Sequence, residues 1–296
     1  MSAILIDGKK IASEIKSELK ERIADLEKKG VFPKLTAVLV GDDPASVQYV
    51  RMKAKACTKI GINSKVIKLP ADANESGLLE LIKYLNADKE VHGILVQLPL
   101  PSHLDQLKVN LTVNIDKDVD GFHPVNLGRL LLGKPNFIPA TPLGISELLL
   151  RSGNSPAGKH TVVLGRGDLV GRPLSILLSL KSNDANSTVT LCHSATTDLG
   201  EFTKQADILI CAMGQPEIIK GDMIKPGAVV IDSGTSAVDD PQSEKGYRIV
   251  GDADFNSVSE TAGYITPVPG GVGPMTIAMV LTNTVIAAEK SVAKNG

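Results

Sequence analysis

Apolar residues recur along most of the chain at spacings that alternate between those of helices and those of strands. In the segment 9–29 they follow one another at intervals of three or four, which predicts an amphipathic helix. Short runs rich in Val, Ile and Leu then alternate with further helical segments. We expect strands over 35–40, 64–69 and 92–97 and helices over 45–60 and 75–86. This β-α-β-α-β order is typical of a parallel sheet covered by helices.

A second α/β pattern follows a less regular stretch, residues 105–140, in which we place the connection between two domains. The acidic, polar stretch 238–246 is expected to be an exposed loop. Gly61 is expected to end the helix over 45–60 as its C′ residue. The remaining elements are strands over 161–164, 188–191, 207–211 and 228–232, helices over 173–180 and 198–205, and an apolar helix over 275–288.

Composition supports two domains of this class. The 296 residues exceed the size at which a single core usually stops growing. Aromatic residues make up only 3% and Trp is absent, so the cores must be built from aliphatic side chains, as in parallel sheets. A net charge of −1 gives no electrostatic reason to expect a nucleic acid or a membrane surface as partner.

Cysteine use and the N-terminus indicate the compartment. Cys57, Cys192 and Cys211 show no CxxC spacing, which favours buried or partly buried free thiols in a reducing environment. The chain begins without a basic, apolar leader, and no apolar run approaches the roughly 20 residues of a membrane span. We therefore expect a soluble, cytoplasmic protein.

A glycine-rich turn connects the predicted strand 161–164 to the helix that follows. Gly165, Gly167 and Gly171 form a G-x-G-x-x-x-G pattern, one residue longer than the common dinucleotide fingerprint. Such a turn lets backbone N–H groups approach a pyrophosphate at a helix N-terminus. A purely structural glycine turn fits the same pattern.

The residues at the end of the next strand help to distinguish a binding site for NADP from one for NAD. Enzymes that use NAD usually carry an acid about 20 residues after the glycines, and here the strand ends in Cys192, His193 and Ser194. Arg166, inside the turn, is suited to a 2′-phosphate, although it also fits a solvated loop arginine. The small residues Ala212 and Gly214 end the strand 207–211 and would let backbone approach a ribose. The pattern favours NADP.

Polar residues with chemical potential lie in the first half. Tyr49 and Lys53 are four apart on one helix face, where a partly desolvated ammonium can act as an acid or a base, although an ordinary surface face has the same spacing. Arg51, Lys55 and Lys59 indicate such a solvated face.

Two further polar residues stand at strand and turn positions. Gln97 ends an apolar strand, where an amide can orient a substrate or a lysine or merely cap the strand. The carboxylate of Asp120 can pair with the donors of an aminopyrimidine such as a pterin, but an Asp-Gly turn explains it equally well. Asp116, Asp118 and Asp120 have the first spacings of a calcium loop without its closing glutamate, so no metal site is expected.

These features occur in the same order as in a known family. The chain resembles the bifunctional methylenetetrahydrofolate dehydrogenase/methenyltetrahydrofolate cyclohydrolase family over nearly its whole length. The motifs that carry the resemblance are Tyr49-Val50-Arg51-Met52-Lys53, Gln97-Leu98-Pro99-Leu100-Pro101, Asp116-Lys117-Asp118-Val119-Asp120-Gly121-Phe122, the segments 165–171 and 188–194, and the Pro- and Gly-rich segment 267–276.

The resemblance implies a fold and an activity. The fold would be two three-layer α/β domains with parallel sheets, the second Rossmann-like, with the folate cleft between them. Residues 1–140 would form the folate domain, with the helix 275–296 packing back on it, and residues 141–274 the NADP domain. The protein would be a homodimer that oxidises 5,10-methylenetetrahydrofolate with NADP and hydrolyses the methenyl product to 10-formyltetrahydrofolate.

The resemblance also implies roles for single residues. Lys53 would be the main cyclohydrolase residue, Tyr49 would stack on the folate ring, and Gln97 would tune the lysine. Asp120 would hold the pterin. Further substrate contacts would be Val96, Leu98, Pro99, Pro269, Gly270, Gly271, Gly273 and Pro274. Cofactor contacts would be Gly165, Arg166, Gly167, Val170, Gly171, His193, Ser194, Ala212, Gly214 and Thr235.

The chain departs from the family's pattern at a few places, and three alternatives stay open. Glycine replaces serine at Gly167, alanine replaces cysteine at Ala140, and the run Ser233-Gly234-Thr235-Ser236 follows the strand aspartate where the family has Val-Gly-Ile-Asn. The alternatives are an NADP oxidoreductase for another small substrate such as an alicyclic acid, a non-catalytic folate- or nucleotide-binding protein, and a dehydrogenase without the second activity.

Overall fold

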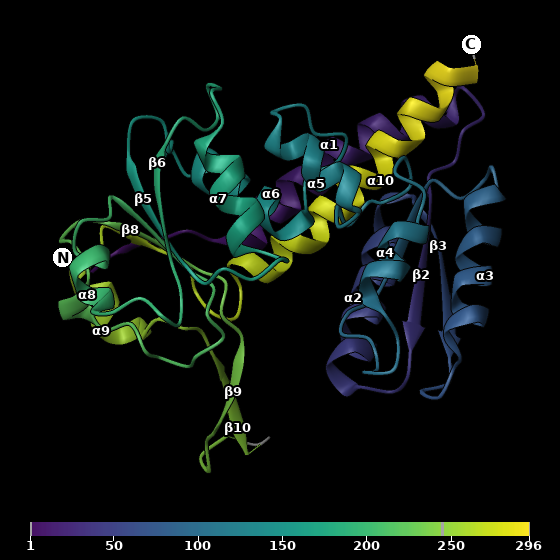
Figure 1. The fold of residues 1–296 in the computed structure, drawn as a ribbon. Coiled ribbons are helices and arrows are strands. Elements are labelled where there is room, and N and C mark those ends of the chain that lie inside the picture. Colours follow the sequence, from purple (N-terminus) through teal and green to yellow (C-terminus); the bar gives the residue numbers. More distant parts are fainter. Residues whose placement is uncertain (1, 244–245, 296) are drawn as a thin grey trace. The chain divides into compact units, whose positions relative to one another are not determined.

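The computed structural model describes residues 2–243 and 246–295, which form two compact units. The first, the six-stranded unit, contains Met1–Ala12 and Thr141–Thr276. The second, the three-stranded unit, contains Ser13–Ala140 and Ile277–Gly296. Both are α/β with parallel sheets, as predicted (Figure 1).

The three-stranded unit is built on β2 (Lys34–Val40), β3 (Asn63–Leu69) and β4 (Gly93–Val96), which pair in parallel in the order β3-β2-β4. Helices α2 (Pro44–Ile60) and α3 (Glu75–Ala87) connect the strands and lie on opposite sides of the sheet (Figure 1). Preceding them is α1 (Gly8–Glu27). These elements occur in the predicted order, and each of their ends lies within two residues of the predicted end.

Helix ends in this unit follow the capping rules. The side chain of Asp43 accepts the backbone N–H of Ser46 at the start of α2, and Asn74 does the same for Gly77 at the start of α3. Gly61 ends α2 with φ of +93°, which confirms the predicted C′ glycine.

The stretch 105–140 is more regular than predicted and is a part of the three-stranded unit. It contains α4 (Gln106–Thr112) and α5 (Pro124–Leu131), and α6 (Ala140–Arg151) begins at its end. Asp105 caps α4, whereas the imidazole of His123 caps α5 by accepting the N–H of Val125. Helices of seven and eight residues carry too few apolar positions to give a readable period.

The last helix, α10 (Val272–Asn295), is longer than predicted and enters the core of the three-stranded unit. Arg22 of α1 donates two hydrogen bonds to Glu289, and Lys290 donates to the carbonyl of Asn136. By length and composition alone the segment Val272–Ala293 could cross a membrane, contrary to our expectation, but 67% of its apolar window is buried inside the protein. Its role as a core helix accounts for its hydropathy.

Asn283 connects α10 to the loop that carries Asp120. Its side chain is 2% exposed and donates to the carbonyls of Val119, at 2.8 Å, and Ile138, at 3.1 Å. Replacing Asn283 by alanine leaves two carbonyls unpaired and is expected to lower the free energy of unfolding by about 2 kcal/mol in urea denaturation. The exposed Asn256 is the control, and its alanine variant should change that energy by less than about 0.5 kcal/mol. Equal values for the two variants would contradict the role of Asn283.

The six-stranded unit has an all-parallel sheet. Its strands are β5 (His160–Leu164), β6 (Thr188–Cys192), β7 (Ile208–Cys211), β8 (Val229–Asp232), β11 (Tyr264–Ile265) and β1 (Ile4–Leu5), in the spatial order β1-β11-β8-β7-β5-β6. Its helical elements are α6 from Thr141 onward, α7 (Gly171–Ser179), α8 (Leu199–Thr203), the 3₁₀ turn η1 (Gly221–Met223) and α9 (Phe255–Thr261). The chain leaves β5 to β6 on one side and then returns to β7 on the other, which creates the switch point at which doubly wound sheets bind ligands.

Besides α6, η1, α9 and β11, for which no element was predicted, two features of this unit differ from the predictions. The first twelve residues cluster with the six-stranded unit rather than with residues 13–140, because β1 pairs with β11. The expected loop 238–246 overlaps an antiparallel ribbon of β9 (Ser236–Asp239) and β10 (Tyr247–Val250), and residues 244–245 lie outside the described part. Figure 1 shows this ribbon extending from the rest of its unit.

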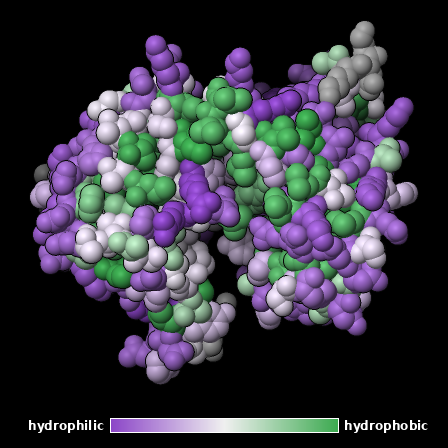
Figure 2. All heavy atoms as spheres, viewed as in Figure 1, coloured by the Kyte–Doolittle hydropathy of each residue, from purple (hydrophilic) through white to green (hydrophobic). Residues whose placement is uncertain are grey.

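The surface is polar with scattered apolar residues. In Figure 2, hydrophilic residues cover much of the visible face of both units, and apolar residues are interspersed among these hydrophilic ones. The three cysteines are buried and free, as predicted. The core of the six-stranded unit includes two of them, Cys192 and Cys211.

Candidate functional site

Lys53 and Gln97 meet within the three-stranded unit. The ammonium of Lys53, on α2, donates to the side-chain carbonyl of Gln97 at the end of β4, with 3.1 Å between Nζ and Oε1. The Nε2 atom of Gln97 donates to the carbonyl of Leu98 at 2.7 Å, which fixes the amide with its oxygen toward the lysine. The two residues are 44 positions apart in the sequence, and the packing of α2 on the sheet brings their side chains together.

Burial of Lys53 separates it from the other cations of α2. Its side chain is 5% exposed, whereas Arg51, Lys55 and Lys59 are exposed as predicted. An ammonium has three donors, and among the described residues Gln97 is the one hydrogen-bond partner of Lys53. A buried charge with unfilled donors is costly unless a ligand or water completes its shell. Lys53 is therefore not a surface lysine, and its free donors are available to a substrate.

Asp120 lies in a turn that Asp118 organises. The buried carboxylate of Asp118 accepts the backbone N–H groups of Phe122 and His123, at 3.1 and 2.9 Å, and the side-chain N–H of Asn126 at 2.8 Å. A Cβ on Gly121, which has φ of +82°, would overlap Pro139, so the turn requires glycine. The sequence marked Asp118 only as a calcium-like position, and its oxygens serve the turn instead.

The carboxyl group of Asp120 lies within electrostatic range of the positive charge of Lys53. Asp120 is half-buried, and desolvation of its carboxyl group raises its pKa, while the charge of Lys53 lowers the pKa and that of Asp118 raises it. The described residues provide no hydrogen bond to this carboxyl group. A carboxyl group with unused acceptors beside a buried ammonium is suited to bind a ligand that carries N–H donors.

Three apolar residues continue from the same strand end. Val96, at the end of β4, is 9% exposed, Leu98 is half-buried and Pro99 is exposed. Tyr49, one turn before Lys53 on α2, is also half-buried. These side chains and the Lys53–Gln97 pair belong to the three-stranded unit.

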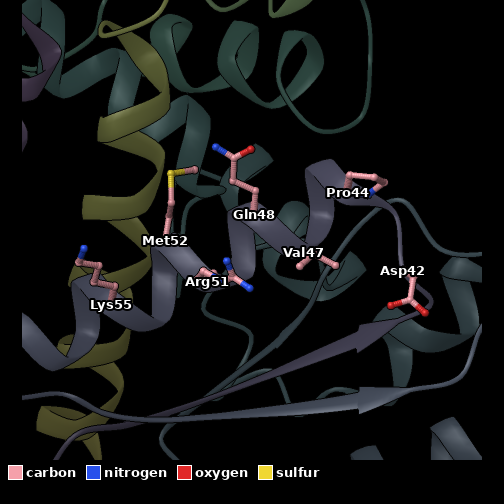
Figure 3. A pocket seen from close by; sticks show the side chains of 7 residues that line it. All are labelled: Asp42, Pro44, Val47, Gln48, Arg51, Met52 and Lys55. Atoms are coloured by element: carbon pink, nitrogen blue, oxygen red, sulfur yellow. The ribbon is translucent and has the colours of Figure 1, made fainter. Parts of the chain in front are cut away.

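A hollow of about 680 Å³ occupies the outer face of α2 (Figure 3). The residues that line it share the exposed side of the helix and its preceding turn, and they are Asp42, Pro44, Val47, Gln48, Arg51, Met52 and Lys55. None of them is a predicted site residue. The hollow is therefore distinct from the Lys53–Gln97 pair, which lies on the buried side.

The glycine turn of the six-stranded unit is tight enough to require glycine at positions 165 and 171, whereas a Cβ on Gly167 would meet nothing within 4 Å. Gly165 has φ of +108°, and a Cβ there would overlap the carbonyl oxygen of Ala212. A Cβ on Gly171 would overlap the carbonyl oxygen of Gly165. No side chain of the described residues caps the N-terminus of α7, where Val170 is the cap residue. In this first turn the N–H of Arg172 donates to the carbonyl of Gly167 at 3.2 Å and Pro173 has no N–H, so the N–H of Gly171 and the helix dipole are what this end offers to an anion.

The other predicted cofactor residues lie just after the ends of β5, β6, β7 and β8. The N–H of Gly165 donates to Cys192 at 2.9 Å, and the N–H of Ala212 donates to Leu164 at 2.8 Å. His193 and Ser194 follow β6 directly, Gly214 follows β7 with φ of +68°, and Gly167 and Thr235 are exposed.

Two arginines of the turn differ in their partners. Arg166 is exposed and forms no ion pair with any described residue, whereas Arg172 pairs with Asp168 at 2.7 Å. Arg166 is therefore the cation of this turn that is available to a phosphate.

The Pro- and Gly-rich segment before α10 is a close-packed loop of the six-stranded unit. Gly270 has φ of +127°, and the N–H of Gly271 donates to Pro267 at 2.8 Å. A Cβ on Gly8 would overlap the carbonyl oxygen of Gly271, so the loop rests on the first residue of α1. Pro269 is exposed, and Gly273 and Pro274 are half-buried in the first turn of α10.

Comparison with known proteins gives one family for both units. Residues 6–120 match the model "Tetrahydrofolate dehydrogenase/cyclohydrolase, catalytic domain", and residues 139–292 match "Tetrahydrofolate dehydrogenase/cyclohydrolase, NAD(P)-binding domain". The chain belongs to the tetrahydrofolate dehydrogenase/cyclohydrolase family. The resemblance stated from the motifs is thereby confirmed.

Similar members of the tetrahydrofolate dehydrogenase/cyclohydrolase family cover the whole chain. The bifunctional protein FolD of Flavobacterium johnsoniae is 54% identical over 98% of this chain and 99% of its own length. The structure of the bifunctional FolD enzyme of Campylobacter jejuni has a TM-score of 0.91 at 46% identity, covering 98% of this chain and 99% of that one. The Trypanosoma brucei enzyme, solved with NADP and an inhibitor, has a TM-score of 0.93 at 42% identity and covers 99% of both chains.

Two buried carboxylates of the six-stranded unit were not among the predicted site residues. Asp232 ends β8 and is 3% exposed, and Asp252 follows β10 and is 0% exposed. Asp232 ends a predicted apolar strand, which was a signal for it, whereas Asp252 follows β10, where no strand was predicted, and had no such signal. Their hydrogen bonds run to backbone N–H groups, as described below.

Proposed function

We propose that this protein oxidises 5,10-methylenetetrahydrofolate to 5,10-methenyltetrahydrofolate with NADP and hydrolyses that product to 10-formyltetrahydrofolate. Membership of the tetrahydrofolate dehydrogenase/cyclohydrolase family supports both activities. The observation that carries the second activity is the buried ammonium of Lys53, oriented by Gln97 and left with free donors.

The residues of the six-stranded unit fit NADP. The close packing at Gly165 and Gly171, the N-terminus of α7 without a side-chain cap and the free cation of Arg166 suit a pyrophosphate and a 2′-phosphate. When bound, NADP accepts the hydride from the one-carbon bridge. The residues proposed to hold it are Gly165, Arg166, Gly167, Val170, Gly171, His193, Ser194, Ala212, Gly214 and Thr235.

The residues of the three-stranded unit bind and orient the folate. Asp120 accepts the N–H donors of the pterin, and Tyr49 stacks on its ring. Val96, Leu98 and Pro99 provide apolar contacts beside Gln97. A further set of contacts is proposed at Pro269, Gly270 and Gly271 in the loop before α10 and at Gly273 and Pro274 in its first turn.

Lys53 then assists the hydrolysis. The methenyl product is a cation, and water adds to its bridge carbon while one carbon–nitrogen bond breaks and a proton is released. The ammonium of Lys53 orients the water and donates a proton from Nζ to the ring nitrogen whose bond to the bridge carbon breaks, and the amine so formed regains a proton from the added oxygen. Gln97 holds Nζ in place through its side-chain carbonyl. Both residues act in the step that needs no nicotinamide.

We further propose that the protein acts in the cytoplasm as a homodimer with tetrahydrofolate derivatives as its substrates. The near-zero net charge and the free, buried cysteines agree with this setting. The proposal includes no nucleic acid and no membrane as partner.

A substrate panel tests the proposal against its alternatives. The purified protein is supplied with NADP and either 5,10-methylenetetrahydrofolate or alicyclic hydroxy acids, and NADPH is measured. We expect NADPH to form with 5,10-methylenetetrahydrofolate and not with the alicyclic hydroxy acids. NADPH with an alicyclic acid would favour the other oxidoreductase, and failure to turn over a substrate labelled at the bridge carbon would favour a binding protein.

Gln97 provides a test that leaves the lysine in place. Replacing Gln97 by leucine removes the acceptor of Lys53 Nζ, so hydrolysis of 5,10-methenyltetrahydrofolate should fall by about ten- to a hundred-fold. The measurement is the decay of the methenyl absorbance without NADP, corrected for the spontaneous reaction. Gln48, exposed on the same helix, is the control, and its leucine variant should hydrolyse at the original rate. Equal rates in the two variants would remove Gln97 from the mechanism.

A further inference from the structure

The carboxylate of Asp252 accepts hydrogen bonds from the loop that follows β7. Its Oδ2 accepts the backbone N–H of Met213 at 2.6 Å and of Gly214 at 3.2 Å, and its Oδ1 accepts the N–H of Gln215 at 2.8 Å. Three consecutive N–H groups thus converge on one carboxylate that is 0% exposed. The conformation of this loop therefore depends on the side chain of Asp252.

Asp232 holds the segment that carries Asp252. Its Oδ1 accepts the N–H of Asp252 at 3.1 Å and of Gly234 at 2.8 Å, and its Oδ2 accepts the N–H of Ala253 at 2.8 Å. One carboxylate at the end of β8 therefore fixes both the loop after β8 and the residue that fixes the loop after β7.

Glycines at positions 234 and 251 leave the space that the two carboxylates occupy. A Cβ on Gly234 would overlap Asp252 Oδ1, and a Cβ on Gly251 would overlap Asp232 Oδ2. Within the described part of the chain, every hydrogen-bond partner of the two carboxylates is a backbone N–H. Burial and the neighbouring charge of Asp252 raise the pKa of Asp232 to about 6, against the lowering effect of the three N–H groups that donate to it.

The two loops carry residues that the proposed function assigns to the cofactor. Ala212 and Gly214 stand in the loop after β7, and Thr235 stands in the loop after β8. A backbone surface contacts a ligand well only if its conformation is fixed before binding, because ordering a loop on binding costs affinity.

We propose that Asp252, held by Asp232, is a positioning residue that pre-forms the two loops for NADP. The inference rests on the proposed function, since it deepens the description of the cofactor site. Neither carboxylate contacts the cofactor or the reacting atoms. Their contribution is to the affinity for NADP rather than to the chemical steps.

The test compares Asp252→Asn with the intact protein. The amide N–H₂ of asparagine would face backbone N–H groups, so at least one of the three bonds is lost. We expect the KM for NADP and the dissociation constant of NADPH to rise by about ten- to a hundred-fold. The kcat at saturating NADP and the NADP-independent hydrolysis of 5,10-methenyltetrahydrofolate should stay within about two-fold. A protein that is merely unfolded would lose kcat as well.

Asp254→Asn is the matched control. Asp254 lies two residues on, pairs with Lys220 at 3.0 Å and caps α9, and its replacement should leave the KM for NADP unchanged. A second variant, Gly234→Ala, keeps both carboxylates but pushes Asp252 aside, and it should show the same rise in KM at constant kcat.

Two results would overturn the inference. One is an unchanged KM for NADP in both Asp252→Asn and Gly234→Ala. The other is a fall in kcat at saturating NADP with an unchanged KM. A wild-type protein that binds no NADPH would overturn the proposed function together with this inference, so the failures can be told apart.

Discussion

Replacing Lys53 by methionine is expected to slow the hydrolysis of 5,10-methenyltetrahydrofolate by at least about a hundred-fold, which is the usual contribution of a positioned acid or base. Methionine keeps the length and the apolar stem that pack at a side chain 5% exposed, so the fold should tolerate it. What it removes is the ammonium that Gln97 orients.

The same variant should still reduce NADP. Hydride transfer from the bridge carbon needs positioning rather than a proton from Lys53, so we expect the rate of NADPH formation to stay within about ten-fold. The methenyl product should then accumulate. Lys55→Met, two residues on and exposed in the hollow of Figure 3, is the control and should keep both activities. Full hydrolysis by the Lys53 variant would refute the role of Lys53.

Replacing Arg166 by alanine is expected to raise the KM for NADP by about a hundred-fold and to leave the KM for NAD within about two-fold. The reason is that Arg166 is the unpaired cation of the glycine turn, and only NADP carries a 2′-phosphate. Initial rates with each cofactor give the two values.

Arg172 provides the comparison in the same turn. Because its guanidinium is already paired with Asp168 at 2.7 Å, its alanine variant should change the KM for NADP by less than about three-fold. Equal rises for NAD and NADP in the Arg166 variant would show that Arg166 supports the turn rather than recognising the phosphate.

The parts of the fold that could be predicted are those with long, local patterns. Helix α1 and strands β2 and β5 carry enough apolar residues at one spacing to be found from sequence. Strand β1 could not be found, because two residues have no period and their state is set by pairing with β11, some 260 positions away. The helices of the stretch 105–140 were missed because polar caps define them more than apolar faces.

The candidate site shows the same division. Gln97 and Lys53 each stood out only weakly, since a strand-end amide and a helical lysine have ordinary explanations. Their pairing arises from the contact of α2 with the sheet, which local patterns do not encode. Asp252 remained invisible because its partners are backbone N–H groups, and these have no signature in the sequence.

The most direct test of the bifunctional account follows both products at once. The protein is mixed with 5,10-methylenetetrahydrofolate and NADP, and NADPH and the methenyl chromophore are recorded together. The account predicts that NADPH rises while the methenyl signal stays low, because each methenyl molecule is hydrolysed soon after it forms. NADPH accompanied by an equal, lasting methenyl signal would contradict the second activity, and no NADPH from folded protein would contradict the first.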